Sequence, residues 1–182
     1  MTEAAIFLDR DGVINRRRLD HVRSWADFEF LPGSLDGLRE MTRMGVPVVV
    51  VTNQSVVGRG LLSEPDLGAI HQRMRSEISA AGGRIDAIYA CLHAPGSGCD
   101  CRKPAPGLLL RAAFELEVQI EASVLVGDSA SDLEAARAAG CTAILVAEGR
   151  PADLDPAVAT VGDLRQAADE IARRMGLLEP RC

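Results

Sequence analysis

The stretch Ala4-Ala5-Ile6-Phe7-Leu8-Asp9-Arg10-Asp11-Gly12-Val13 decides the fold that this sequence predicts. A short apolar run that ends at polar turn residues is typical of a buried strand inside a parallel sheet. Asp9 would then stand at the carboxyl end of the strand, where open α/β sheets bind their ligands. Asp9 and Asp11 repel each other unless a cation or a proton relieves the repulsion. A solvated Asp-Gly turn explains this stretch equally well by itself, so the rest of the chain has to decide.

Strands and helices are predicted to alternate along the whole chain. Further strand-like runs lie at 46–51, 85–89, 124–126 and 143–146, and apolar residues at helical spacing separate them. Ser34 is expected to cap one helix, and Ser131 and Glu134 to form a capping box at the start of another. This alternation predicts one α/β domain over residues 1–182, doubly wound around a mainly parallel sheet.

Composition narrows the class of protein. The 182 residues are 47% hydrophobic and 25% charged, which is ordinary for a globular domain of this length. A formal net charge of −6 argues against a surface that binds nucleic acid. The sequence shows no apolar run of membrane-spanning length and no signal peptide, so we expect a cytoplasmic protein without a membrane partner.

Four potential soft ligands lie close together between 91 and 101, namely Cys91, His93, Cys99 and Cys101. Three thiols and one imidazole match the ligand set of a closed, structural zinc site. The spacings Cys-x-His and Cys-x-Cys are tighter than in common zinc fingers, but the Pro/Gly-rich segment between the pairs could fold back. A loop of free cysteines is the alternative, and the spacing favours Zn²⁺ over it.

Polar residues that follow three predicted strands should converge at one edge of the sheet. They are Asp9 and Asp11, Thr52, and Asp128, with Lys103 added by the segment after the cysteine cluster. Three carboxylates without an evident neutralising base suit a hard cation such as Mg²⁺. Carboxylate, Mg²⁺, lysine and hydroxyl together are what phosphoryl transfer requires. No Gly-x-x-x-x-Gly-Lys-Ser/Thr loop is present, which disfavours a P-loop nucleotide hydrolase.

The loop after the first strand carries three consecutive cations, Arg16, Arg17 and Arg18. Such a run is usually a solvated loop, and that interpretation is favoured here. The alternative is a loop that faces an anionic substrate, because a phosphate ligand favours nearby cations.

These motifs resemble those of the haloacid dehalogenase-like phosphatases. Asp9-x-Asp11-Gly-Val, Thr52 after a strand, Lys103, and Gly127-Asp128 with Asp132 match the four motifs of that family, in order, over nearly the full chain. Thr52-Asn53-Gln54-Ser55, Arg59-Gly60 and the cysteine cluster leading into Cys-Arg-Lys-Pro look like the branch of heptose bisphosphate phosphatases and histidinol-phosphatases. The close spacing of the elements leaves no room for a large cap domain, so a Rossmann-like fold with a small zinc loop at 91–101 is expected.

The resemblance also implies a role for each site residue. Asp9 would be the nucleophile that forms an aspartyl-phosphate, and Asp11 the acid and then the base. Thr52 and Lys103 would bind phosphoryl oxygens. Mg²⁺ would be held by Asp9, the backbone carbonyl of Asp11 and Asp128, with Asp132 supporting them. The substrate, expected to be a sugar bisphosphate such as heptose 1,7-bisphosphate cleaved at its 7-phosphate, would contact the residues Asn53, Gln54, Ser55, Arg59 and Arg102. Zinc would be bound by Cys91, His93, Cys99 and Cys101, and the enzyme would be a monomer.

Some positions depart from the pattern of the heptose enzymes. Val56 stands where they usually have Gly, Ser129 where they usually have Lys, and Asp20-His21-Val22 where they usually have Gly-Tyr-Val. None of these changes alters the core chemistry, but each could border the substrate. Histidinol phosphate or another small phosphomonoester is therefore an alternative substrate, although the histidinol enzymes tend to carry Asp where Ser55 stands.

Two further alternatives are disfavoured. A phosphatase acting on DNA ends shares the predicted fold, but the acidic balance and the lack of a basic stripe argue against it. A non-catalytic, zinc-stapled binding module would be expected to have lost some of the motif, yet Asp9, Asp11, Thr52, Lys103 and Asp128 are all present.

Overall fold

The structure is a computed structural model and describes residues 4–176. Its centre is a six-stranded sheet in the order β3-β2-β1-β4-β5-β6, in which every neighbouring pair is parallel. The strands are β1 (Ile6–Leu8), β2 (Val48–Asn53), β3 (Ala87–Cys91), β4 (Val124–Gly127), β5 (Thr142–Val146) and β6 (Ala159–Val161). This arrangement confirms the predicted α/β fold with a parallel, doubly wound sheet.

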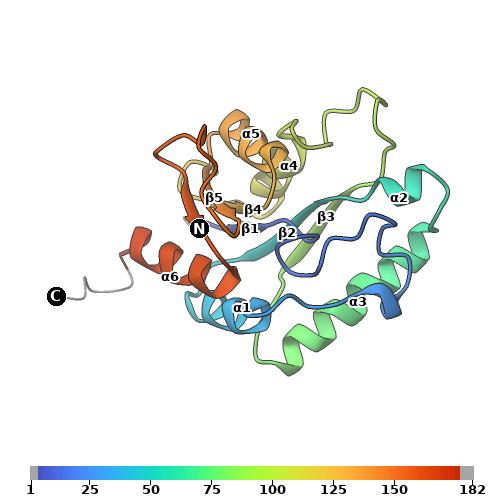
Figure 1. The fold of residues 1–182 in the computed structure, drawn as a ribbon, viewed down its shortest axis with the longest axis horizontal. Coiled ribbons are helices and arrows are strands. Elements are labelled where there is room, and N and C mark those ends of the chain that lie inside the picture. Colours follow the sequence, from blue (N-terminus) through green and yellow to red (C-terminus); the bar gives the residue numbers. More distant parts are fainter. Residues whose placement is uncertain (1–3, 177–182) are drawn as a thin grey trace.

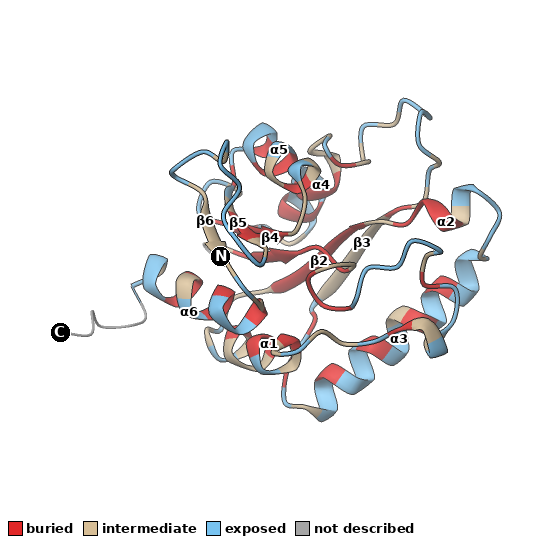
Figure 2. Cartoon of the chain, in the orientation of Figure 1, coloured by how far each residue is buried: buried red, intermediate tan, exposed pale blue. Residues whose placement is uncertain are grey.

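Helices cover both faces of the sheet (Figure 1). They are η1 (Trp25–Asp27), α1 (Ser34–Arg43), α2 (Ser55–Gly58), α3 (Glu64–Ala80), α4 (Gly107–Glu115), α5 (Ala130–Ala139) and α6 (Leu164–Arg174). Helices α1, α3 and α6 share one apolar core with the sheet, and α4 and α5 share the other. Figure 2 shows the central strands as the most deeply buried part of the chain.

Strand β1 contributes to both cores because successive side chains of a strand point to opposite faces. Ile6 and Leu8 pack with α1, α3 and α6, whereas Ala5 and Phe7 pack with α4 and α5. All four side chains are fully buried. A strand buried on both faces reads as a continuous apolar run, which is why this stretch predicted a central parallel strand correctly.

Two predicted helix caps were wrong. Gly33, with φ +77°, is the N-cap of α1, and Ser34 is the first helical residue, with its hydroxyl buried and without a partner among the described residues. The left-handed conformation that glycine tolerates turns the chain into the helix there, which leaves no capping role for the serine. At α5 the cap is Ser129, whose N–H and hydroxyl both donate to Asp132, so the capping pair lies two residues before the predicted one.

The third strand also differs from its prediction, since it runs over Ala87–Cys91 rather than 85–89. Ile85 instead packs into the core below the strand, and Asp86 accepts a hydrogen bond from the N–H of Val48 at the start of β2. The shift matters for the site, because it places the first cysteine of the cluster at the carboxyl end of β3.

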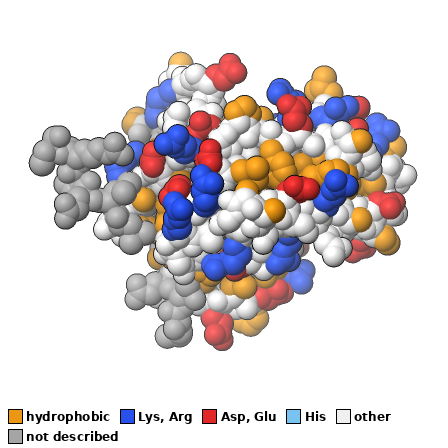
Figure 3. All heavy atoms as spheres, turned by 90° about the horizontal axis from the view of Figure 1, so that it is seen from below, with side chains coloured by type: hydrophobic (Ala, Val, Ile, Leu, Met, Phe, Trp, Pro, Cys, Tyr) orange, Lys and Arg blue, Asp and Glu red, His pale blue; other side chains and the backbone are white. Residues whose placement is uncertain are grey.

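Two observations concern membrane-spanning helices and the charge of the surface. No helix within residues 4–176 combines the length and apolarity needed to cross a bilayer. Acidic and basic side chains are interspersed on the face seen in Figure 3 rather than gathered into a basic stripe. The single domain over 1–182 stays a prediction, and its outermost residues, 1–3 and 177–182, lie outside the described residues.

Candidate active site at the carboxyl edge of the sheet

A polar pocket of about 280 Å³ lies where β1, β2 and β4 end. Its lining includes Asp9 and Asp11 after β1, Thr52 at the end of β2, and Lys103 from the loop before α4. Parallel strands end at the same edge of a sheet, so residues that are far apart in sequence meet there. The structure thus brings together the polar residues that the strand ends predicted.

Lys103 is the central cation of this pocket. Its Nζ lies 2.9 Å from Asp9 Oδ1 and 2.6 Å from Asp132 Oδ1, and it donates to the carbonyl of Val51 at 2.9 Å. The side chain is only 3% exposed. Burial opposes its charge, but the carboxylates of Asp9 and Asp132 outweigh burial and raise the pKa of Lys103. Lys103 is therefore a fixed positive charge beside the Asp9 carboxylate.

Asn53 holds the lysine loop in place. Its side-chain amide donates to the carbonyl of Lys103 at 3.0 Å and accepts from the Lys103 N–H at 3.1 Å. Both ends of the amide are thus occupied by the loop, although Asn53 also lines the pocket. This bracing role was not part of the sequence prediction, which placed Asn53 in contact with the substrate.

Three carboxylates form a cluster at this edge of the sheet, and two of them, Asp9 and Asp132, line the pocket. One oxygen each from Asp9, Asp128 and Asp132 lies within 4.8 Å of the other two. Burial raises the pKa of Asp9, and burial and the neighbouring carboxylates raise that of Asp128 to about 7. Burial and the closeness of the carboxylates both oppose their ionisation, which additional positive charge would favour. A divalent cation would supply it.

Asp132 differs from the other two carboxylates in that both of its oxygens have protein partners. Oδ1 binds Lys103, and Oδ2 accepts hydrogen bonds from the N–H groups of Asp128 and Ser129 and from the Ser129 hydroxyl. Asp9 and Asp128 each have one oxygen paired, with Lys103 and Arg17, and one oxygen without a partner among the described residues. These two carboxylates are therefore the candidate metal ligands, with Asp132 orienting them. A side chain at Gly12 would overlap the Asp128 carboxylate, so the β1 loop is also shaped around this position.

Asp11 is held by a network that the sequence did not reveal. Both of its oxygens accept from Arg10 Nη2 at 2.9 Å, and they also accept from Asn15 and Gln54. Burial by itself would raise the pKa of Asp11, but the charge and hydrogen bonds of Arg10 and the two amides lower it. Asp11 therefore rests as a carboxylate. Asn15 and Gln54 are buried, and Arg10 is 1% exposed.

His71 on α3 completes this network. Its Nε2 lies 3.1 Å from Arg10 Nη1. Burial and the Arg10 charge lower the pKa of His71 to about 4, so the ring is neutral and accepts the arginine hydrogen bond. An arginine between two aspartates was the only sequence signal for this network.

The predicted substrate-binding residues divide into two groups. Gln54, Ser55 and Arg102 line the pocket, whereas Arg59 is exposed at the end of α2 and is not part of the lining. Arg102 Nη1 is buried and has no partner among the described residues. Of the positions that depart from the family pattern, Ser129 and His21 line the pocket, while Val56 is 1% exposed in the interior.

The cysteine cluster has the geometry of a tetrahedral metal site. Cys91 Sγ lies 3.7 Å from Cys99 Sγ and 3.6 Å from His93 Nδ1, and that nitrogen lies 3.2 Å from Cys101 Sγ. Zinc–sulfur bonds of about 2.3 Å would place two sulfurs of a tetrahedron about 3.8 Å apart. The four ligand atoms therefore fit Zn²⁺, and Arg102 and Lys103 follow the last cysteine directly.

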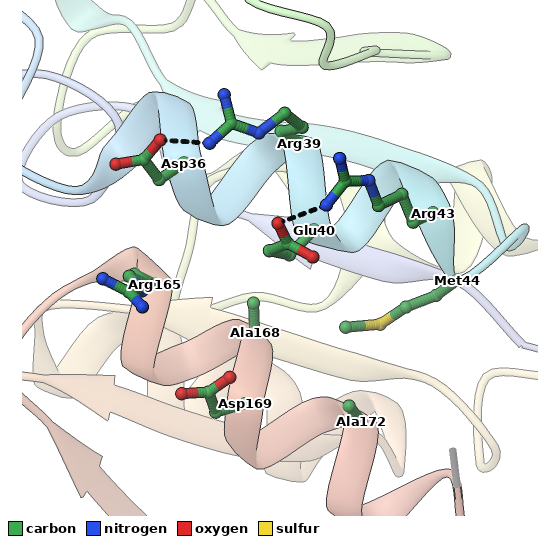
Figure 4. Close-up of a pocket in the computed structure, with 9 residues that line it drawn as sticks. All are labelled: Asp36, Arg39, Glu40, Arg43, Met44, Arg165, Ala168, Asp169 and Ala172. Atoms are coloured by element: carbon green, nitrogen blue, oxygen red, sulfur yellow. Dashed lines mark hydrogen bonds and ion pairs between the residues drawn. The ribbon is translucent and has the colours of Figure 1, made fainter. Parts of the chain in front are cut away.

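A second, larger hollow of about 680 Å³ lies between α1 and α6 (Figure 4). It contains none of the predicted site residues. Two of its arginines pair with acids on the same helix, Arg39 with Asp36 and Arg43 with Glu40. The chemistry-bearing residues are therefore in the smaller pocket at the strand ends.

Comparison with known proteins finds relatives of this chain. A family described as HAD-hydrolase-like matches residues 100–173. The chain is 43% identical over 144 residues to D-glycero-beta-D-manno-heptose-1,7-bisphosphate 7-phosphatase of Bordetella bronchiseptica, covering 79% of this chain and 80% of that protein. It is 42% identical over 150 residues to D-glycero-alpha-D-manno-heptose-1,7-bisphosphate 7-phosphatase of Mycobacterium bovis, covering 78% of each.

A solved structure shares the fold closely. The D,D-heptose 1,7-bisphosphate phosphatase from B. bronchiseptica, complexed with magnesium and phosphate, superimposes with a TM-score of 0.86 at 38% identity. The match covers 93% of this chain and 98% of that one. The likeness thus extends over nearly all of both proteins.

Proposed function

This chain belongs to the haloacid dehalogenase-like hydrolases, as a phosphatase akin to the heptose-1,7-bisphosphate 7-phosphatases, and we propose that it removes the 7-phosphate of D-glycero-D-manno-heptose 1,7-bisphosphate. One observation carries the assignment of the chemistry to this pocket. Asp9 lies at the end of β1, 2.9 Å from a buried lysine and beside two further carboxylates. A carboxylate nucleophile, a fixed cation and a metal-binding pair are together what transfer of a phosphoryl group to an aspartate needs.

The first half of the proposed reaction transfers the phosphoryl group to the protein. The Asp9 carboxylate attacks phosphorus while the bond from phosphorus to the sugar oxygen breaks. Lys103 holds the orientation of Asp9 and, with the Thr52 hydroxyl, binds oxygens of the transferring group. Asp11 donates a proton to the leaving sugar oxygen, for which it must first leave Arg10 and take up a proton.

The second half releases phosphate. Asp11, now a carboxylate, takes a proton from water, whose oxygen attacks the phosphorus of the aspartyl-phosphate and frees the Asp9 carboxylate. The resting arrangement of Asp11, ionised and bonded to Arg10, is the form that this second step requires. Because the protein base takes the proton as water attacks, the reaction does not need a free hydroxide ion as the nucleophile.

Mg²⁺ is proposed as the catalytic cation, held by Asp9, Asp128 and the backbone carbonyl of Asp11. When bound, it would neutralise negative charge on the phosphoryl oxygens. Two features support it, namely the grouping of the carboxylates and the raised pKa values of Asp9 and Asp128. Zn²⁺ is proposed as a structural ion on Cys91, His93, Cys99 and Cys101, where four protein ligands leave no open position for substrate.

The experiment that tests the substrate is a comparison of phosphate release in the presence of Mg²⁺. Both anomers of heptose 1,7-bisphosphate, histidinol phosphate and fructose 1,6-bisphosphate would be assayed, with Asp9→Asn as the inactive control. We expect heptose bisphosphate to lead by about a hundredfold in kcat/KM, which corresponds to about 2.7 kcal/mol in transition-state binding. Equal rates on all four compounds would refute the heptose assignment, and activity retained by Asp9→Asn would refute the nucleophile.

A further inference from the structure

The connection between β1 and α1 places a cationic loop at the mouth of the pocket. It runs along α3 (Figure 1), where Arg73 lies over the ring of Trp25. Of its three consecutive arginines, Arg17 and Arg18 line the pocket and Arg16 does not. The loop therefore faces the site.

The neighbours of Arg17 are already paired within the loop region. Arg16 donates two hydrogen bonds to Glu29, at 2.9 and 3.0 Å. Arg18 donates two to Asp20, at 3.0 and 2.9 Å. In both cases the guanidinium forms a bidentate pair with one carboxylate. The positive charges of Arg16 and Arg18 are thus already balanced by carboxylates of the protein.

Arg17 is different, because its partner is a predicted metal ligand. Its Nη2 lies 2.7 Å from Asp128 Oδ1, and the described residues offer its side chain no other hydrogen-bond partner. A metal ion on Asp128 would compete with the guanidinium for the same carboxylate and repel its charge. Metal loading would thus release Arg17, whose side chain is 53% exposed, beside the open pocket.

A second guanidinium in the same pocket, that of Arg102, has a donor without an acceptor. Arg102 Nη1 is buried without a partner among the described residues, and a buried donor left unpaired is costly. Arg102 and Arg17 approach the pocket from different loops. Planar guanidinium groups with several N–H donors match the oxygens of a phosphate.

We infer that Arg17 exchanges Asp128 for the uncleaved phosphate of the substrate when the metal binds, and so makes the enzyme prefer a bisphosphate to a monophosphate. This inference rests on the proposed function. The uncleaved phosphate carries a charge between −1 and −2 at neutral pH, and Arg17 is the cation of the loop that metal binding leaves without a carboxylate. Its neighbours Arg16 and Arg18 stay paired, so within this loop Arg17 is the arginine that determines the preference.

The test compares two sugars that share the ester to be cleaved. Heptose 1,7-bisphosphate and heptose 7-phosphate are assayed with the Mg²⁺-loaded full chain and its Arg17→Ala variant. We expect the ratio of the two kcat/KM values to fall about tenfold or more, through a higher KM for the bisphosphate. Arg17→Lys should recover part of the preference, since it keeps the charge but loses the planar fork. Arg16→Ala is the matched control, because it removes the same charge from the same loop outside the pocket.

A second readout does not depend on turnover. Calorimetric titration of the metal-free protein with Mg²⁺ at alkaline pH should show tighter binding by Arg17→Ala than by the wild type, because the competing guanidinium is gone. Arg16→Ala should bind Mg²⁺ as the wild type does. Equal Mg²⁺ affinity of Arg17→Ala and the wild type would overturn the exchange of partners.

The outcomes separate this inference from the proposed function. An enzyme that is active on heptose bisphosphate, with a substrate ratio that Arg17→Ala leaves unchanged, overturns the inference alone. An equal loss on both sugars also overturns it, because Arg17 would then serve the cleaved phosphate or the metal site. A wild type that is inactive on both sugars refutes the proposed function and the inference with it.

Discussion

Acid should destabilise this protein partly through one histidine, His71. Its imidazole lies against Arg10, and its pKa is about 4 in the folded chain against 6.5 for a free histidine. The unfolded chain therefore binds this proton more readily, and the stabilisation present above pH 6.5 is lost as the pH falls toward 4. At about 1.4 kcal/mol for each unit of pKa difference, integration from neutral pH to about pH 4.5 gives a loss of about 2 kcal/mol.

The measurement is the free energy of unfolding by urea at the two pH values, for the wild type and for His71→Gln. Glutamine keeps an oxygen that can accept from Arg10 but cannot take up a proton. The variant should lose about 2 kcal/mol less than the wild type on acidification, since all other titrating groups are shared. His21→Gln is the control, because the His21 ring makes no hydrogen bond within residues 4–176. Equal losses in wild type and His71→Gln would refute the assignment of a neutral, buried imidazole.

Three shorter predictions concern the metal sites and the lysine. Gly12→Ala should weaken Mg²⁺ binding by about tenfold or more and cost about 1–2 kcal/mol of stability, because Gly12 has φ +95° and a Cβ would overlap the Asp128 carboxylate; unchanged calorimetric affinity would contradict this. Lys103→Met should abolish phosphatase activity and destabilise the fold by about 3–5 kcal/mol, since it leaves buried carboxylates without their cation; a loss below about 1 kcal/mol in urea would speak against it. A chelator should release about one Zn²⁺ per chain in a colorimetric assay and lower the Tm, and Cys99→Ser should lower the Tm as well. An unchanged Tm would count against a structural ion.

Much of the fold was predictable because the relevant signals are local. Apolar runs bounded by turn residues located five of the six strands to within about two residues, and the alternation with helices predicted the parallel sheet. The helix caps were less predictable. Ser34 is a favourable capping residue, but the conformation of Gly33 moved the start of the helix by one position. Boundaries depend on single backbone angles, which composition does not report.

The main site residues were predictable for a geometric reason. Asp9 and Asp128 directly follow apolar strands and Thr52 lies near the end of one, and parallel strands end at one edge whatever their order. The strand order β3-β2-β1-β4-β5-β6 then decides which ends are neighbours, and β1 lies between β2 and β4. The position of Arg59 shows the limit of motif matching, since the residue is present in the sequence but exposed outside the pocket.

By itself, the sequence determined the fold class, the residues at the strand ends and the grouping of three cysteines and a histidine, since each depends on neighbours within a few positions along the chain. Only the tertiary structure decided which charges pair. Arg10 is a residue type usually found at the surface, yet it is buried, with its Nη1 against His71, 61 positions away, and its Nη2 donating to Asp11. Arg17 faces Asp128 across 111 positions. The packing of the whole sheet brings such partners together, and no local sequence pattern indicates a contact between residues so far apart along the chain.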